Sequence, residues 1–495
     1  MHDLVHDLAR SVLGSKSICA GDNVSDEIRH ARYMSLKSVG DESCAISKEA
    51  AKYVRVLLFE GKVFHDMLLD FKSLHVLILK ELPLEIGELT SLQTLPYFQV
   101  GRERGRTIVE LGSLKNLKGT LEIHNLEKVC DKEDAKSAHL FQKPNIFKLK
   151  FTWSELREGE INDENVLEGL QPHSNLKSLE IDGFKGRNFP LWILKMVVHD
   201  DLEGWWIGLN HLREIRLTHC KECDKIPMLG HLPHLKRLYL HDLTNLRSID
   251  SSFYGIGSYS TPSSALPLAN ICGIKLISLT ELKIDKVDGL INTIFTQTQG
   301  FTNLYTLQVS SCEALTSFPS EMVASCAASL EMLLLNRLNS STSFPEVISH
   351  LPRMSRLAYL GISDVPKFTC LPMEIGPLVN LYHVIVSPSS DSSDLASYIE
   401  FLDVLFGGLK SLRSLWLFGH EHWDSLPDWL QNQTSLSELA ICSFGIEVFP
   451  EWIGKLTSLK KLKLWSCNKL KSLPSVATIQ KLEMEIEDCP LLEQR

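Results

Sequence analysis

The sequence lacks any long apolar run. Its longest nearly uncharged apolar stretch, PLWILKMVV at residues 190–198, falls well short of the ~20 residues that a membrane-spanning helix needs. The first residues show no basic segment followed by an apolar one, which is the pattern of a secretory signal. Acidic residues outnumber basic ones by 61 to 51, for a formal net charge of −10, which argues against a general affinity for nucleic acid or anionic membranes. We therefore predict a soluble, cytoplasmic protein with no membrane span and no nucleic-acid partner.

Cysteine is sparse, and catalytic motifs are missing. Twelve cysteines in 495 residues are too few and too scattered for a disulfide scaffold, so we expect reduced thiols. No phosphate-binding loop is present, because GRERGRT at residues 101–107 lacks the lysine and the residue order of such a loop. Neither a Gly-x-Ser-x-Gly elbow nor a Cys/His arrangement above chance is found. Nothing in the sequence therefore supports an enzyme, and we assign no catalytic residue.

An internal repeat is the dominant feature of the sequence. Segments such as LNHLREIRLTHC (209–220), FTNLYTLQVSSC (301–312) and LTSLKKLKLWSC (456–467) follow the leucine-rich-repeat pattern L-x-x-L-x-L-x-x-N/C. From residue 215 onward the apolar pair of this pattern recurs every 23 to 31 residues, apart from one gap of 44. The pairs are Leu179/Ile181, Ile215/Leu217, Leu238/Leu240, Leu282/Ile284, Leu307/Val309, Leu333/Leu335, Leu360/Ile362, Val384/Val386, Leu415/Leu417, Leu439/Ile441 and Leu462/Leu464.

The repeat predicts the fold. Alternate residues of a strand point to opposite faces, so each apolar pair enters a core while the residues between face outward. One unit cannot bury its apolar face alone, so neighbouring units stack and their strands form a parallel sheet. We predict an α/β leucine-rich-repeat solenoid, a horseshoe with a concave parallel β-sheet, over residues 36–495. Departures from the repeat are expected near 126–172, 248–270 and 387–400, and Trp429 and Trp452, which follow Pro-led turns, are expected in the convex side of the core.

Two stretches resemble parts of metal sites, and we predict no metal at either. Cys220 and Cys223 form a C-x-x-C followed by two histidines, His231 and His234, which is half of a zinc pattern. However, Cys220 also occupies the N/C position of its repeat, where a small side chain fits a buried turn.

The stretch HDLVH at residues 2–6 resembles the H-E-x-x-H helix of zinc proteases, but aspartate replaces the general base glutamate. Its apolar residues at helical spacing favour a packed helix with histidines at its border.

Four stretches together resemble one family, the plant intracellular coiled-coil nucleotide-binding leucine-rich-repeat (NLR) resistance proteins. MHDLVHDLA (1–9) is similar to the family's MHD motif, and RHARYMSL (29–36) to the segment that leads into the repeats. LTSLQTLPYFQVGRERGRTIVELGSLKNLKGTLEIHNLEKV (89–129) and CDKIPMLGHLPHLKRLYL (223–240) are similar to blocks within its repeats. The resemblance covers essentially the whole chain.

The resemblance implies a nucleotide switch in the family. It assigns residues 1–35 to the winged-helix end of the switch module, with a short helical remnant and a linker, and Met1, His2 and Asp3 to the motif whose histidine lies against bound nucleotide. The coiled-coil domain and phosphate loop lie upstream in the family, so we expect an N-terminally truncated chain without a cofactor of its own, ADP or ATP being expected only in full-length members. The segment 71–96 also has fewer repeats than is usual in the family.

The resemblance further implies a function for the repeats. In the family they recognise pathogen effectors, or the host proteins that effectors modify, and they restrain the switch module. Recognition is expected at the outward positions of the concave sheet. Phe418, Cys442 and Trp465 are expected to form one column, with Trp416, Ala440 and Lys463 in the column beside it.

The candidate partner-binding residues form a main patch and a weaker second patch. They are Trp416, Phe418, Lys463 and Trp465 in the first and Arg216, Tyr239 and His241 in the second. Exposed aromatic rings near a cation are typical of binding hot spots. The alternative is that the rings pack on each other or on the C-terminal tail.

Three functions are compatible with these sequence features. We favour an immune-receptor fragment; the alternatives are a non-immune leucine-rich-repeat scaffold or adaptor, and a metal enzyme built on HDLVH.

Overall fold

A computed structural model describes most of the repeat region. The described residues are 17–19, 32–37, 48–60, 70–79, 82–157, 162–200, 205–227, 229, 232–246, 276, 278–287, 301–312, 315, 320–338, 350–364, 378–388, 395–406, 409 and 411–492. The chain forms two compact units, and each is described by itself. Unit 1 comprises residues 1–235 with 255–271, and unit 2 comprises residues 236–254 with 272–495.

Unit 1 contains two parallel sheets and one antiparallel pair. The first sheet has the strands β1 (Ser17–Cys19), β2 (Tyr33–Lys37), β3 (Val56–Glu60) and β4 (Val76–Leu79), in that order. The second has β5 (Tyr97–Gln99), β6 (Gly119–His124), β7 (Ile146–Thr152), β8 (Ser178–Asp182) and β11 (Glu214–Thr218). The antiparallel pair is β9 (Val197–Asp200) with β10 (Trp205–Gly208).

Short helices connect the strands of unit 1. They are α2 (Lys48–Ala51), α4 (Glu110–Ser113), α5 (Lys132–Lys136), α6 (Asp163–Gly169) and α7 (Leu191–Leu194), with 3₁₀ turns η3 (Ile86–Glu88), η4 (Leu126–Lys128) and η5 (Leu140–Gln142). The described residues of segment 126–172, where a departure from the repeat is expected, include the two α-helices α5 and α6 on either side of strand β7. The boundary predicted at residue 35 falls inside β2, so the first sheet extends across it.

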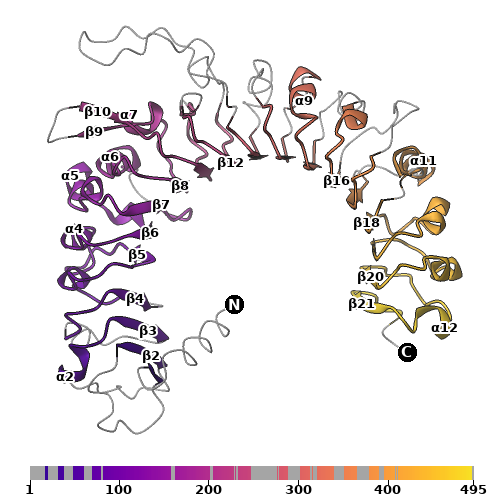
Figure 1. The fold of residues 1–495 in the computed structure, drawn as a ribbon, viewed down its shortest axis with the longest axis horizontal. Coiled ribbons are helices and arrows are strands. Elements are labelled where there is room, and N and C mark those ends of the chain that lie inside the picture. The colour runs from indigo at the N-terminus through magenta and orange to yellow at the C-terminus, as the bar shows by residue number, and fades with distance from the viewer. Residues whose placement is uncertain are drawn as a thin grey trace. The chain divides into compact units, whose positions relative to one another are not determined.

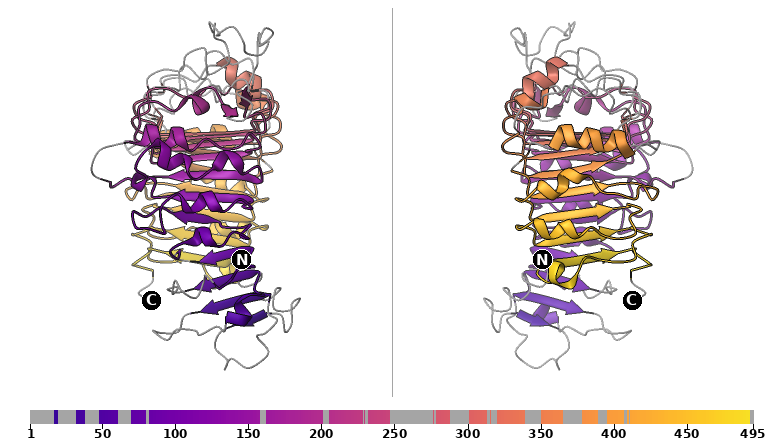
Figure 2. Two further views of the ribbon diagram at one scale, coloured as in Figure 1. Left: turned by 90° about the vertical axis from the view of Figure 1, so that its left-hand side faces the viewer. Right: turned by 90° about the vertical axis from the view of Figure 1, so that its right-hand side faces the viewer.

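The described residues of unit 2 form a regular stack of ten parallel strands, each paired with the next along the chain. Its strands are β12 (Arg237–His241), β13 (Glu281–Asp285), β14 (Thr306–Ser310), β15 (Met332–Asn336), β16 (Tyr359–Ser363), β17 (His383–Ser387), β18 (Ser414–Phe418), β19 (Glu438–Cys442), β20 (Lys461–Trp465) and β21 (Glu483–Glu487). Figure 2 shows the strands of each unit running side by side.

Helices lie on one side of the strands of unit 2 (Figure 1). The α-helices are α9 (Ser320–Cys326), α11 (Leu395–Phe406) and α12 (Val476–Ile479), and the 3₁₀ turns are η7 (Leu351–Arg353), η8 (Asp428–Asn432) and η9 (Glu451–Lys455). Residues 395–400, which the sequence places in an irregular segment, form the first half of α11. We call the other side of this sheet the open face; it is made by the first, third and fifth residue of each strand.

The apolar pairs of the repeat form the core. All eleven pairs lie in strands, from β8 to β20, and none of their side chains is more than 1% exposed. Trp429 in η8 and Trp192 in α7 are also buried, whereas Trp452 in η9 is half-buried. The predicted solenoid is confirmed, because the two-residue alternation of each strand places its apolar pair inside and its other residues outside.

Ten of the described strands end in the same backbone turn. The residue after β6, after each of β11 to β16 and after each of β19 to β21 has a left-handed φ between 48° and 62°, although none of these residues is glycine. The turn directs its N–H to the neighbouring repeat: Ser443 N donates to the Trp465 carbonyl oxygen (2.9 Å) and Ser466 N to that of Glu487 (3.0 Å). Left-handed geometry is unfavourable for an L-residue by about 1 kcal/mol, so hydrogen bonding between repeats stabilises it.

Candidate functional site

The open face of β18 to β20 carries the residues of the predicted main patch. Trp416 is in register with Ala440, and Ala440 with Lys463; Phe418 is likewise in register with Cys442, and Cys442 with Trp465. Both columns are as the repeat spacing predicts.

The two tryptophans reach each other across the middle strand. Trp416 on β18 and Trp465 on β20 have ring centroids 5.1 Å apart, in an edge-to-face arrangement with an interplanar angle of 88°. Between them lie Ala440 and Cys442 of β19, which are 0% and 2% exposed. Because these two side chains are small, the indoles can lean over β19 and cover it. Edge-to-face contact is a favoured geometry for aromatic rings.

Lys463 is built into this pair of rings. Its Nζ lies 4.5 Å from the centroid of Trp416 and 5.3 Å from that of Trp465, within the range of a cation–π interaction. The same Nζ lies 3.0 Å from a carboxylate oxygen of Glu438, and the lysine side chain is only 12% exposed. Burial opposes ionisation of Glu438, but its hydrogen bond with Lys463 lowers its pKa below the usual value. The cation is therefore compensated within the chain.

The contacts match the alternative that the sequence left open, because the rings pack on each other. Trp416, Phe418 and Trp465 nevertheless remain half-buried, so part of each ring is accessible. The ring nitrogens Nε1 of Trp416 and Trp465 are buried and have no acceptor among the described residues. Ring contacts and Lys463, rather than hydrogen bonds, fix the orientation of the two indoles.

The cluster extends further than the sequence suggested. His383 of β17 stacks on Tyr359 of β16 with centroids 4.3 Å apart and lies 6.4 Å from the ring of Trp416. Burial lowers the pKa of His383, which favours an uncharged ring. We call Tyr359, His383, Trp416 and Trp465 the aromatic row. Its first two members precede the apolar pair of their strands, and aligning every repeat at this position would have found them.

A helix on the covered side supports Phe418. Tyr398 of α11 is 1% exposed, and its hydroxyl donates to the Phe418 carbonyl oxygen (3.0 Å). Burial raises the pKa of Tyr398, so the hydroxyl keeps its proton. The end of β18 is therefore anchored through its backbone, while the Phe418 ring stays on the open face.

The second predicted patch falls in two units. Arg216 belongs to unit 1 and pairs with Glu214 of the same strand. Tyr239 and His241 belong to unit 2: Lys283 lies 5.1 Å from the Tyr239 ring centroid, and His241 Nδ1 lies 2.8 Å from Asp285. Arg216 therefore forms an ion pair with an acidic neighbour, and His241 also contacts one.

The cysteines suspected of zinc binding have structural contacts. Cys220 and Cys223 are both buried, and their thiols donate to the carbonyl oxygens of Thr218 (3.3 Å) and Gly186 (3.4 Å). Cys312, Cys467 and Cys489 make equivalent contacts in later repeats. His231, and Met1, His2 and Asp3 of the MHD stretch, lie outside the described residues. Among the described residues, no group of three or more His, Cys, Asp or Glu has a metal-binding arrangement.

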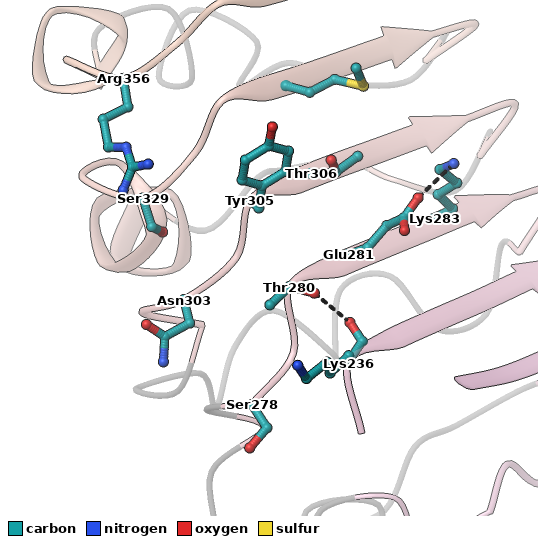
Figure 3. Close-up of a pocket in the computed structure, with 11 residues that line it drawn as sticks. Lys236, Ser278, Thr280, Glu281, Lys283, Asn303, Tyr305, Thr306, Ser329 and Arg356 are labelled. Atoms are coloured by element: carbon teal, nitrogen blue, oxygen red, sulfur yellow. Dashed lines mark hydrogen bonds and ion pairs between the residues drawn. The ribbon is translucent and has the colours of Figure 1, made fainter. Parts of the chain in front are cut away.

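A shallow hollow of about 760 Å³ lies at the amino-terminal ends of β13 to β15 (Figure 3). Most of the residues that line it are polar in type, and the sequence did not point to it. Two of the three cations that line it have acidic neighbours, since Lys283 lies 2.7 Å from Glu281 and Arg356 lies 2.5 Å from Glu331. This pairing leaves little net charge to hold a charged small molecule.

The strand register and the buried pairs define the chain as a leucine-rich-repeat protein. A family model described as R13L1/DRL21 leucine-rich repeats matches residues 108–243 and 408–489. Disease resistance protein RGA2 of Solanum bulbocastanum is 30% identical over 286 residues, covering 52% of this chain and 27% of the relative. Putative disease resistance RPP13-like protein 1 of Arabidopsis thaliana is 27% identical over 339 residues, covering 56% and 30%. Over about half of its length, the chain is therefore similar to plant disease resistance proteins.

One more relative and one solved structure are similar to the chain. Putative disease resistance protein RGA1 of Solanum bulbocastanum is 39% identical over 159 residues, covering 32% of this chain and 15% of the relative. The chain thus spans less than a third of the length of these three relatives. The solved leucine-rich-repeat protein LIC12759 of Leptospira interrogans aligns at 18% identity and a TM-score of 0.42, covering 82% of this chain and 93% of that one. None of the described helices is both long enough and apolar enough to cross a membrane.

Proposed function

We propose that this chain is the protein-recognition part of a plant immune receptor, and that the open face of unit 2 contacts a pathogen effector or a host protein modified by one. The observation that carries the proposal is the aromatic row on that face, in a chain whose relatives are disease resistance proteins. Tryptophan and tyrosine are enriched among the few residues that dominate the energy of protein interfaces.

The proposal assigns binding rather than catalysis to the chain, and it places the protein in the cytoplasm. The same repeats would restrain a nucleotide-binding switch module in longer family members, where ADP or ATP would be the cofactor. We propose no cofactor for this chain itself; in the aromatic row, Lys463 is paired with Glu438 and the two indole rings contact each other.

The test is a binding screen of the chain against a panel of pathogen effectors and host proteins. Each positive pair is then measured with Trp416→Ala and Trp465→Ala. Each substitution is expected to weaken binding by tenfold or more, which corresponds to about 1.4 kcal/mol.

Val448→Ala is the matched control, because Val448 is 62% exposed and lies between β19 and η9, away from the open face. Val448→Ala should leave binding unchanged, and binding that resists both tryptophan substitutions would reject the open face as the recognition surface. Circular dichroism of each variant separates a binding effect from unfolding.

A further inference from the structure

The open face of unit 2 has an uncharged centre. The open-face positions of β14 to β18 number fifteen, three on each of five strands, and none is Asp, Glu, Lys or Arg. All fifteen are described. In a chain that is 23% charged, about three charged residues would be expected there, and more on an ordinary surface, where charged residues concentrate. We call these fifteen positions the uncharged face.

The middle of the uncharged face is apolar and continuous. Leu334 leans over Gly361, since a Cβ at Gly361 would lie 2.4 Å from Leu334 Cδ2. The next residue in the same register is Ile385, followed by Trp416. Strands in a sheet are about 4.8 Å apart, so the line from Leu334 on β15 to Trp465 on β20 spans about 24 Å.

A polar margin follows one side of this line. Asn336, Ser363 and Ser387 end three successive strands, are half-buried and are in register with one another. Hydroxyl and amide groups can donate to and accept from a peptide main chain without adding charge. The margin thus suits the backbone of a bound segment, while the apolar line suits its side chains.

Charged residues return to the open face on β19 to β21, and their net charge is negative. The open-face residues of β21 are Glu483, Glu485 and Glu487. Lys461 lies 3.3 Å from Glu483 and 3.1 Å from Glu485, while Lys463 is held by Glu438. Glu487 is exposed and stands opposite Trp465 in register. Counting Glu438 with these three glutamates, four carboxylates face two lysines on β19 to β21, a net charge of −2.

We propose that the open face of β14 to β21 receives a protein segment lying across the strands, with uncharged apolar side chains over β15 to β18 and a lysine or arginine over Trp465 and Glu487. The cation would face an indole ring and a carboxylate together, a pairing that combines cation–π and ionic attraction. A charged side chain over the uncharged face would lose its hydration without gaining a counter-ion, so such segments are rejected. This inference rests on the proposed function, because it specifies the chemistry of the same surface.

The experiment uses random twelve-residue peptides displayed on phage and selected on the whole purified chain. Enriched peptides are expected to be rich in aliphatic and aromatic residues, poor in Asp and Glu, and to carry Lys or Arg towards one end. Their affinities are then measured as synthetic peptides by fluorescence polarisation. Absence of any enriched peptide, or enrichment of acidic ones, overturns the proposal.

Two variants and one control test the two halves of the surface. Ile385→Glu places a carboxylate in the uncharged face and is expected to weaken the binding of the selected peptides at least tenfold. The double charge reversal Glu485→Lys with Glu487→Lys is expected to change the end preference from basic to acidic residues. Glu421→Lys reverses an exposed charge off the open face and should leave affinity and preference unchanged. The proposal is overturned if the selected peptides bind Ile385→Glu as tightly as the wild-type chain. It is also overturned if the double variant still selects peptides with a basic end.

The outcomes separate this inference from the proposed function. A chain that binds the expected peptides through this face but binds no effector or host protein refutes the proposed function alone. A chain that binds an effector through Trp416 and Trp465 but tolerates Ile385→Glu refutes the segment proposal alone.

Discussion

Replacing Lys143 with methionine is expected to stabilise the chain at neutral pH. Lys143 follows η5, and its side chain is 1% exposed. Its Nζ donates to one acceptor, the Leu114 carbonyl oxygen at 3.0 Å, at the end of α4. Burial, with a smaller contribution from the charge of Lys115, lowers the pKa of Lys143 from 10.5 to about 8. At pH 7 the protein therefore holds a buried ammonium group without a described counter-ion.

The magnitude follows from this pKa. A fall from 10.5 to about 8 makes the charged form less favourable in the folded chain by about 3 kcal/mol, at 1.36 kcal/mol for each pH unit. Methionine removes this cost but cannot donate to Leu114, and the loss of that hydrogen bond costs about 1 kcal/mol. Methionine otherwise fills a similar volume. The expected net gain is about 2 kcal/mol.

The pH dependence has a definite sign. In the unfolded chain the amine stays protonated up to about pH 10.5, whereas in the folded chain it loses its proton near pH 8. Between these values the unfolded chain binds more protons, so this group makes stability rise with pH. Below about pH 8 its contribution to the pH dependence is nearly flat. Lys143→Met removes the rise.

Urea unfolding followed by circular dichroism at pH 7 and pH 9.5 measures both effects. The difference in stability between variant and wild type should be about 2 kcal/mol at pH 7 and should shrink by about that amount at pH 9.5. Lys118→Met is the control, since Lys118 is exposed and donates to Gln93; it should keep the wild-type pH dependence. A destabilised Lys143→Met, or a gain that is the same at both pH values, would refute the reasoning.

Three further substitutions have expected outcomes that thermal or urea unfolding can check. Asp163→Asn should destabilise the chain by about 3 kcal/mol, because it leaves Arg157 buried without its counter-ion; an unchanged midpoint would show that solvent reaches the pair. Gly445→Ala should cost about 2 to 3 kcal/mol, because its Cβ would lie 1.9 Å from the Glu421 carbonyl oxygen, and a neutral effect would contradict that close approach. Ser466→Gly should stabilise by about 0.5 kcal/mol, since φ is 54° there; a loss of stability would mean that the serine side chain supports the turn.

The strands of the repeat could be predicted from the sequence because their information is local. Each apolar pair marks one strand, and the fixed register of stacked repeats then sets the columns of the open face. The position of Trp416 beside Ala440 and Lys463 follows from this spacing alone. In contrast, the contact between Trp416 and Trp465 involves three neighbouring strands, because the rings meet in the space left by the small side chains of Ala440 and Cys442 on β19. The sequence of any one repeat therefore does not predict it.

Helix α11 shows a different limit. The serine-rich break that precedes it favours an irregular segment, and this outweighed the apolar spacing of the residues that follow. Tyr398, Phe401 and Leu402 recur at helical intervals and are buried in α11. The left-handed turn that follows ten of the described strands could not be predicted from residue type either, because its residues, such as His219 and Arg337, are not glycine. The register of the repeat, rather than local preference, imposes it.

The most direct test of the recognition surface is hydroxyl-radical footprinting of the chain, free and bound to a partner found in the binding screen. Trp416 and Trp465 are half-buried on the open face, and Trp452 is half-buried in η9, so all three should be oxidised in the free chain. Protection of Trp416 and Trp465, with Trp452 unchanged, is the predicted result. Unchanged oxidation of both open-face tryptophans in the complex would contradict the account.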